Sequence, residues 1–201
     1  MLQAKIPFGI YVNADDTEAA LKKKSSIHFN DYSVITNIKE INSFIQKKTT
    51  IGSEVFKGLI TKSIFVENNI LVVNPAIINS YTASLIADFI RQQLLKNGAG
   101  FSFETVMSHQ SKINFLNAAN KQGYNTYFYF VFTNNPEINY QSVLSRVAKV
   151  GHTVDKEKLL ERYKRSNQFF KKACEIVDRC YVFDNTNKLE LIQEYKSGKL
   201  I

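Results

Sequence analysis

Apolar and polar positions follow two periods along the chain, one typical of strands and one typical of helices. Short apolar runs predict strands at Ile6–Val12, Phe101–Phe103 and Tyr124–Phe132. Apolar positions three and four apart predict helices between and after these strands, at about residues 15–21, 79–96, 108–121 and 134–147. This alternation predicts an α/β fold with right-handed crossovers, in which a mainly parallel sheet carries helices on both faces.

Residues 22–78 interrupt the alternation. Apolar spacing predicts a helix at about Tyr32–Lys48 and a short second helix at about Ser53–Thr61. Two β-branched runs then flank Asn68 and Asn69, which tolerate the positive φ of a tight hairpin turn. We therefore predict one domain spanning residues 1–201, with a small helix-plus-hairpin insertion at about 22–78.

Two predicted strands end on carboxylates. Glu104 follows Phe101–Phe103, and Asn13 with Asp15 and Asp16 follows the first strand. The carboxyl ends of parallel strands form the edge at which open sheets bind ligands, so these side chains are candidates for chemistry. The alternatives are a solvated Glu104 and a purely capping role for the two aspartates, which is the commoner use of such a pair. We also expect Ser108 to cap the helix that follows.

The amino-acid composition alone allows several classes of partner, and the positions of the charged residues and cysteines exclude some of them. The net charge is +8, which suits a polyanion, but the lysines are spread along the chain and generic basicity is the favoured interpretation. Cys174 and Cys180 lack companions at metal-ligand spacing, so we expect reduced, buried thiols and no metal site. No apolar run approaches a membrane span, and we expect a cytoplasmic protein without a membrane partner.

A basic segment at residues 145–165 offers a candidate phosphate clamp. Arg146 and Lys149 lie three residues apart, as do Arg162 and Arg165, on two helices that Gly151 separates. Guanidinium groups form paired hydrogen bonds with phosphate oxygens. An ordinary solvated helix face is the alternative for each of these residues taken singly. His152 of the same segment is more often a packed or turn residue than a base.

Four motifs in order resemble the zeta-toxin-like P-loop kinases: Val-Asn-Ala-Asp at 12–15, Phe-Glu-Thr-Val-Met-Ser at 103–108, the basic segment through Ser166, and Asp-Asn-Thr at 184–186. The resemblance implies an ATP- and Mg²⁺-dependent phosphotransferase with Asp15 as general base on a substrate hydroxyl. It implies that Glu104 places substrate or metal and that Arg146 and Arg162 hold phosphates. Substrate and nucleotide contacts are then expected from Asn13, Thr105, Ser108, Lys149, His152, Arg165 and Asn185.

The chain departs from that family at the phosphate loop. The pattern Gly-x-x-x-x-Gly-Lys-Ser/Thr does not occur, because Gly52 and Gly58 have the wrong spacing and Leu200 follows Gly198-Lys199. The family's first strand and this loop would precede Asn13. Either a neighbouring strand closes the gap in the sheet or the chain is amino-terminally shortened, which we favour, and we expect the chain as it stands not to catalyse phosphate transfer. Val150 and Asp155 are smaller departures, at positions where the family usually has Gly and Pro.

Three functions remain, of which we prefer the first for the ancestry of the chain and the second for the chain as printed. The first is a zeta-toxin-like kinase that acts on a small hydroxyl-bearing molecule, such as the UDP-sugar used by the best-known members. The second is a non-catalytic remnant that binds nucleotide or a partner protein, an antitoxin being the candidate that the resemblance implies. The third, well behind, is a basic nucleic-acid-binding protein, for which affinity would fall steeply with salt.

Overall fold

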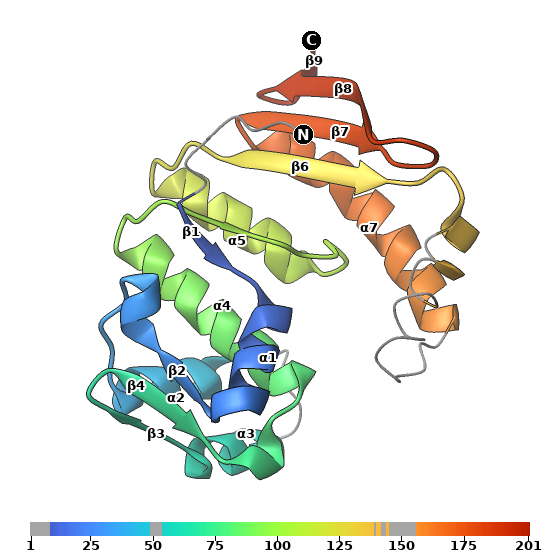
Figure 1. Ribbon diagram of the computed structural model, residues 1–201. Coiled ribbons are helices and arrows are strands. Elements are labelled where there is room, and N and C mark those ends of the chain that lie inside the picture. Colours follow the sequence, from blue (N-terminus) through green and yellow to red (C-terminus); the bar gives the residue numbers. More distant parts are fainter. Residues whose placement is uncertain (1–8, 49–53, 139, 142–143, 145–155) are drawn as a thin grey trace. The chain divides into compact units, whose positions relative to one another are not determined.

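The computed structural model describes residues 9–48, 54–138, 140–141, 144 and 156–201. The chain is α/β and divides into two compact units, Met1–Glu104 and Thr105–Ile201, which we describe separately (Figure 1). The described residues form three sheets: a two-stranded one and a three-stranded one in the first unit, and a four-stranded one in the second. The prediction of an α/β fold is confirmed, whereas a single, mainly parallel sheet is not found among these residues.

Two short parallel strands hold the candidate site of the first unit. Strand β1 (Ile10–Val12) pairs with β5 (Phe101–Phe103), and Val12 lies opposite Phe103. Gly9 precedes β1 with φ +66°, and a Cβ there would lie 2.1 Å from the carbonyl oxygen of Gly100. Only glycine therefore allows the two backbones to approach this closely. Helices α1 (Ala14–Lys24) and α4 (Ser80–Lys96) pack together, and α4 also contacts β1.

The insertion forms a small sheet with its own helices. Strands β3 (Ile64–Glu67) and β4 (Ile70–Val73) make the predicted hairpin, and Asn68 and Asn69 adopt φ values of 49° and 63°. Strand β2 (Ser26–His28), which we did not predict, pairs with β4, and the 3-10 helices η1 (Phe29–Tyr32) and η2 (Pro75–Ile77) flank this sheet. Helix α3 (Glu54–Lys62) matches its prediction, whereas α2 (Ile38–Lys47) begins six residues later than Tyr32. The reason is that Asn37 caps α2 through its side chain.

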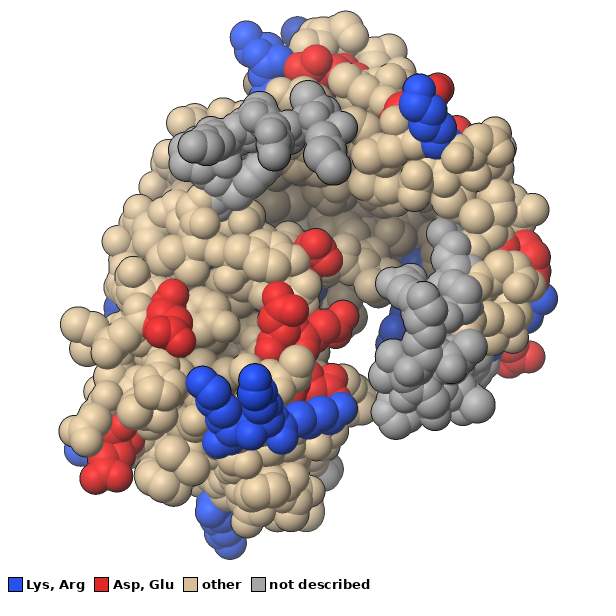
Figure 2. Space-filling view, in the orientation of Figure 1, with Lys and Arg blue, Asp and Glu red and all other residues tan. Residues whose placement is uncertain are grey.

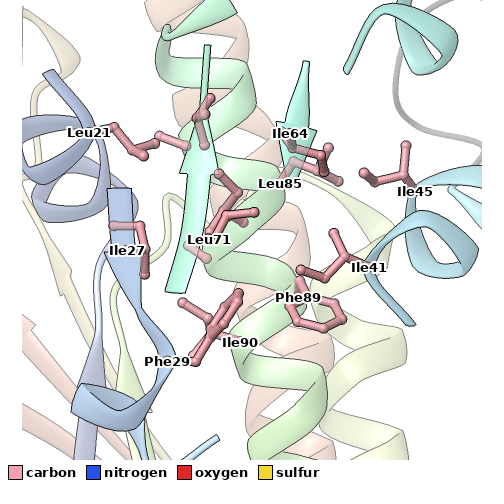
Figure 3. Close-up of a cluster of buried hydrophobic side chains, with 14 of the residues drawn as sticks. Leu21, Ile27, Phe29, Ile41, Ile45, Ile64, Leu71, Leu85, Phe89 and Ile90 are labelled. Atoms are coloured by element: carbon pink, nitrogen blue, oxygen red, sulfur yellow. The ribbon is translucent and has the colours of Figure 1, made fainter. Parts of the chain in front are cut away.

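The insertion and α4 share one hydrophobic core (Figure 3). Phe89 of α4 contacts Phe29 and Phe44 edge to face, at ring-centroid distances of 5.9 and 5.3 Å. Burial of one side chain of this size contributes about 2–3 kcal/mol to the free energy of unfolding. Residues 22–78 are therefore packed onto the helix that also contacts β1, and they help to position the strands of the site.

The second unit carries a mixed sheet in the order β6-β7-β8-β9. Its strands are β6 (Tyr127–Phe132), β7 (Arg179–Asp184), β8 (Glu190–Lys196) and β9 (Lys199–Leu200). Only β6 and β7 are parallel. Helices α5 (Gln110–Lys121) and α7 (Lys156–Ile176) pack on the side that carries Phe128, Phe130 and Val182.

The packing of this sheet corrects two predictions. We predicted helices on both faces of the sheet, but the described helices of the second unit cover one face, and Tyr127, Tyr129 and Val131 of β6 are exposed on the other. The cap of α5 is His109, whose ring nitrogen accepts from the backbone N–H of Ser111, and not Ser108. Gly123 ends α5 with φ +77°, as expected.

Cys174 at the end of α7 and Cys180 of β7 are joined by a disulfide, which corrects the prediction of reduced thiols. Both cysteines are buried, as expected. Among the described residues, no helix combines the length and apolarity that crossing a bilayer requires.

Candidate functional site

Asn13 and Glu104 meet at the carboxyl ends of β1 and β5. Because Val12 pairs with Phe103 in parallel register, the next residue of each strand emerges at the same edge. The Asn13 amide nitrogen lies 3.5 Å from the Glu104 carboxylate oxygen, at the long limit of a hydrogen bond. Residues 91 positions apart in sequence are thus neighbours, as the strand-end argument predicted.

The aspartates lie in the first turn of α1. Asn13 caps this helix, since its side-chain oxygen accepts from the backbone N–H of Asp15 at 2.7 Å. Asp15 and Asp16 are exposed and complement the positive end of the helix dipole. Acidic side chains gather over the start of α1 and lysines over its end (Figure 2). The capping role and a chemical role are compatible, because capping uses Asn13 and leaves both carboxylates at the surface.

Tyr11 belongs to this group of side chains, and we did not predict it from the sequence. The Asn13 amide donates to the Tyr11 hydroxyl at 2.8 Å. This bond lowers the pKa of Tyr11, but partial burial and the nearby Glu104 carboxylate raise it, and the net pKa lies above its ordinary value. The signal in the sequence was the alternation in β1: Ile10 and Val12 face the core, so Tyr11 faces outward.

Thr105 and Ser108 lie in the segment that leads from β5 to α5. The Thr105 hydroxyl accepts from the backbone N–H of Met107, which is buried and has φ 55°. Ser108 is half-buried and makes no part of the helix cap. Thr105 therefore has a local structural role.

The described cations of the candidate clamp are Arg162 and Arg165 on α7. Both are exposed, and Arg165 donates to Glu161 one turn away at 3.3 Å. The Tyr163 hydroxyl donates to the carbonyl of Thr133 at 2.9 Å, which fixes this part of α7 beside the carboxyl end of β6. Arg146, Lys149 and His152 lie outside the described residues.

Asn185 follows β7 at the same edge of the second sheet. Its backbone N–H donates to the carbonyl of Phe132 at 2.8 Å, which continues the parallel pairing of β6 with β7. Asp184 accepts from the backbone N–H of Thr186, and the Thr186 hydroxyl accepts from Asn134. Polar groups from the ends of β6 and β7 thus form one network, and Tyr163 brings α7 to it.

The described residues form no group of three or more His, Cys, Asp or Glu side chains that could hold a metal ion by themselves. Mg²⁺ usually binds proteins through one or two carboxylates together with substrate phosphates. The donor set near Glu104 and Asp15 fits only that weaker arrangement. Because the acids belong to the first unit and Arg162 to the second, their convergence on one cleft stays a prediction.

Comparison with known families decides the ancestry. A model of the zeta toxin family, described as "Zeta toxin", matches residues 76–197, more than half of the chain. The chain belongs to the zeta toxin family. No curated protein matches it, and no solved structure matches it. For this zeta toxin family member, the match covers Glu104, Thr105, Ser108, Arg146, Lys149, His152, Arg162, Arg165 and Asn185, whereas Asn13 and Asp15 precede it.

Proposed function

We propose that the chain derives from an ATP-dependent phosphotransferase that acts on a small hydroxyl-bearing substrate. The observation that supports this most strongly is the meeting of Asn13 and Glu104 at the ends of two parallel strands, with Asp15 in the adjoining helical turn. Carboxylates at such an edge can accept hydrogen bonds from substrate hydroxyls and remove a proton from one of them. Membership of the zeta toxin family supports the same reaction class.

The residues divide into two functions in this proposal. Asp15 is the general base, while Glu104 and Asn13 bind the substrate hydroxyls; Asn13 supplies a donor beside the two acceptors. Arg162 and Arg165 hold phosphate oxygens of ATP, since guanidinium groups neutralise charge on a transferring phosphoryl group. Bound Mg²⁺ would supply further charge neutralisation at the phosphates. A UDP-sugar is the substrate class to test first.

The missing phosphate loop limits what these 201 residues do. The printed sequence contains no Gly-x-x-x-x-Gly-Lys-Ser/Thr, so it offers no lysine and no backbone cradle for the β and γ phosphates. Losing one preorganised donor typically costs about a hundredfold in rate. We therefore propose that the chain as printed binds substrate without transferring phosphate.

Substrate binding tests this proposal without depending on turnover. The protein is titrated with UDP-N-acetylglucosamine, with UDP alone and with N-acetylglucosamine, and binding is followed by calorimetry. Asp15→Asn and Glu104→Gln should each weaken binding about tenfold or more, because each change removes a charged acceptor. Glu67→Gln is the matched control, since Glu67 is an exposed carboxylate on β3 of the same unit.

Binding that all three variants retain equally would remove the acids from the proposed site. A mixture of ATP, Mg²⁺ and the bound sugar should give no phosphorylated product with the 201-residue chain; rapid product formation would show that the loop is dispensable. The alternative function, a nucleotide- or partner-binding remnant, predicts that Arg162→Ala weakens ATP binding while Asp15→Asn and Glu104→Gln leave the binding of UDP-N-acetylglucosamine unchanged. The observation that supports this alternative is that Arg162 is exposed on α7 and can reach a ligand from solution.

A further inference from the structure

The sheet of the second unit has an apolar face that no described helix covers. In β6 the side chains alternate, and Phe128 and Phe130 contact the layer formed by α5 and α7. Tyr127 and Val131 point to the opposite side and are 58% and 53% exposed. Leu191 of β8 is 51% exposed. Figure 1 shows α5 and α7 together beneath β6 and β7.

The strand register orders this open face into three cross-strand rows. The rows are Val131–Phe183–Leu191, Tyr129–Tyr181–Glu194 and Tyr127–Arg179–Lys196. The rings of Tyr129 and Tyr181 stack at a centroid distance of 5.1 Å, so the part of the middle row on β6 and β7 is flat and aromatic, while its third member, Glu194, pairs with Arg179. The face therefore changes from aliphatic and aromatic at the carboxyl ends of β6 and β7 to cationic at their amino ends.

At the amino ends of β6 and β7, the positively charged side chains of the open face outnumber the negatively charged ones. Arg179 is paired with Glu194, but Lys196 and, opposite it, Lys199 of β9 are exposed. Residues 105–201 hold 15 Lys and Arg against 9 Asp and Glu, which is +6 of the chain's net charge of +8. A ligand for this face needs apolar groups along most of its length and negative charge at one side or end.

We propose that the open face, defined by the three rows above, docks an amphipathic helix of a partner protein that carries an acidic flank. Strands of a parallel pair such as β6 and β7 are normally covered on both faces, in α/β proteins by helices. Six residues of strand span about 20 Å, which matches a helix of about 13 residues. Carboxylates on the helix flank complement Lys196 and Lys199.

Single-stranded nucleic acid fits this face less well. Base stacking uses aromatic platforms with cations along the whole backbone track. Here one of the three rows is made of Val131, Phe183 and Leu191, and the lysines lie at the opposite end. The helix proposal also stands apart from the kinase proposal, because it uses none of the residues assigned to substrate or phosphate.

A tryptophan-bearing peptide provides a direct probe, because the protein contains no Trp. The probe is an amphipathic peptide of about 18 residues with leucines on one face, glutamates on the flank and a single Trp. An analogue with lysines in place of the glutamates is the matched control peptide. Trp fluorescence reports binding of each peptide to the full 201-residue protein. We expect the acidic peptide to bind at least about tenfold more tightly than the basic one.

Protein variants test whether binding uses the open face. Val131→Arg should weaken the acidic peptide at least about tenfold, whereas Val55→Arg should not, since Val55 is 81% exposed on α3 of the other unit. Lys196→Glu should reduce the preference for the acidic peptide and strengthen binding of the basic one. Circular dichroism confirms that each variant is folded, which is expected because all three side chains are exposed.

Four results of the binding experiments would overturn the proposal. They are the absence of peptide binding, equal affinity for the two peptides, acidic-peptide binding that Val131→Arg leaves unchanged, and tighter binding of an oligothymidylate that Val131→Arg abolishes. The last result would instead assign the face to nucleic acid. Sedimentation of the protein alone completes the test: a dimer that Val131→Arg dissociates would assign the face to a second copy of the chain and would equally overturn the helix proposal.

Discussion

Asn13 combines a structural role with a place in the candidate site, and substitution can separate the two. Asn13→Ala removes the cap of α1, which accepts from Asp15, and the donor to the Tyr11 hydroxyl and Glu104. The lost cap costs about 1 kcal/mol. The lost, partly exposed donor adds about 0.5 kcal/mol. With a urea dependence of about 2 kcal/mol/M for a chain of this size, the unfolding midpoint should fall by about 0.7 M.

Asn37 is the matched control for this prediction. Its side-chain oxygen caps α2 by accepting from Lys39 and Glu40, and no contact to the candidate site is described for it. Asn37→Ala should therefore cost only the cap, about 1 kcal/mol. Urea unfolding followed by circular dichroism gives both values. Equal losses for the two alanine variants would show that the contacts of Asn13 with Tyr11 and Glu104 add nothing to stability.

Aspartate at the same two positions tests the electrostatics of the site. Asn37→Asp keeps a capping oxygen and adds a charge that the helix dipole favours. Asn13→Asp also keeps the cap, but it replaces the amide donor with a carboxylate about 3.5 Å from Glu104. Two like charges at that distance in water repel by about 1 kcal/mol, and salt screens the repulsion. Both aspartates gain the dipole term, so Asn13→Asp should be less stable than Asn37→Asp at low salt, and the difference should shrink in 1 M salt; a difference independent of salt would contradict this reasoning.

Three further outcomes follow from individual contacts. Tyr163→Phe should cost about 1 kcal/mol in urea unfolding, because it removes the hydrogen bond to the Thr133 carbonyl. Reduction of the Cys174–Cys180 disulfide should lower the free energy of unfolding by about 2 kcal/mol, measured with and without reductant. Burial raises the pKa of Tyr32 above 10.0, so its contribution to stability is present below pH 10 and is lost as the pH rises towards the folded pKa. Tyr32→Phe should accordingly reduce the loss of stability between pH 9 and 11.

The parts of the fold that the sequence predicted are those specified by local signals. Asn68 and Asn69 specify a turn with two positive φ values, and the hairpin of β3 and β4 follows from it. The apolar face of α4 and its end at Asn97 and Gly98 are equally local. Strand β2 was missed because Ser26–His28 contains a single apolar residue, and its pairing with β4 makes it a strand. The sequence did not show that the described helices cover only one face of β6, because this strand is apolar at every position whichever face is buried.

In the candidate site too, the sequence predicted the features with a local signal and missed those that depend on contacts with other residues. The strand-end argument predicted that the segment carrying Asp15 and Asp16 and the one carrying Glu104 would emerge at the same edge, and the parallel register places Asn13, the residue before that helical turn, beside Glu104. Tyr11 was missed because the alternation in β1 shows only that this side chain faces outward, whereas its place in the site depends on the Asn13 side chain. Ser108 was chosen as a cap from residue type, but His109 supplies the acceptor, because the buried Met107 at φ 55° sets where the chain enters α5.

The acidic half of the site depends on very few structural features. Gly9 permits the close approach of β1 to the backbone before β5, and the register then sets Asn13 beside Glu104. The Asn13 side chain fixes the first turn of α1, which carries Asp15. Helix α4 supports these features and is held from its other side by the core of the insertion. Substitutions on the outer surface of residues 22–78 should therefore leave the acids in place. A loss of core packing around Phe89 should instead displace α4 and, with it, the acids.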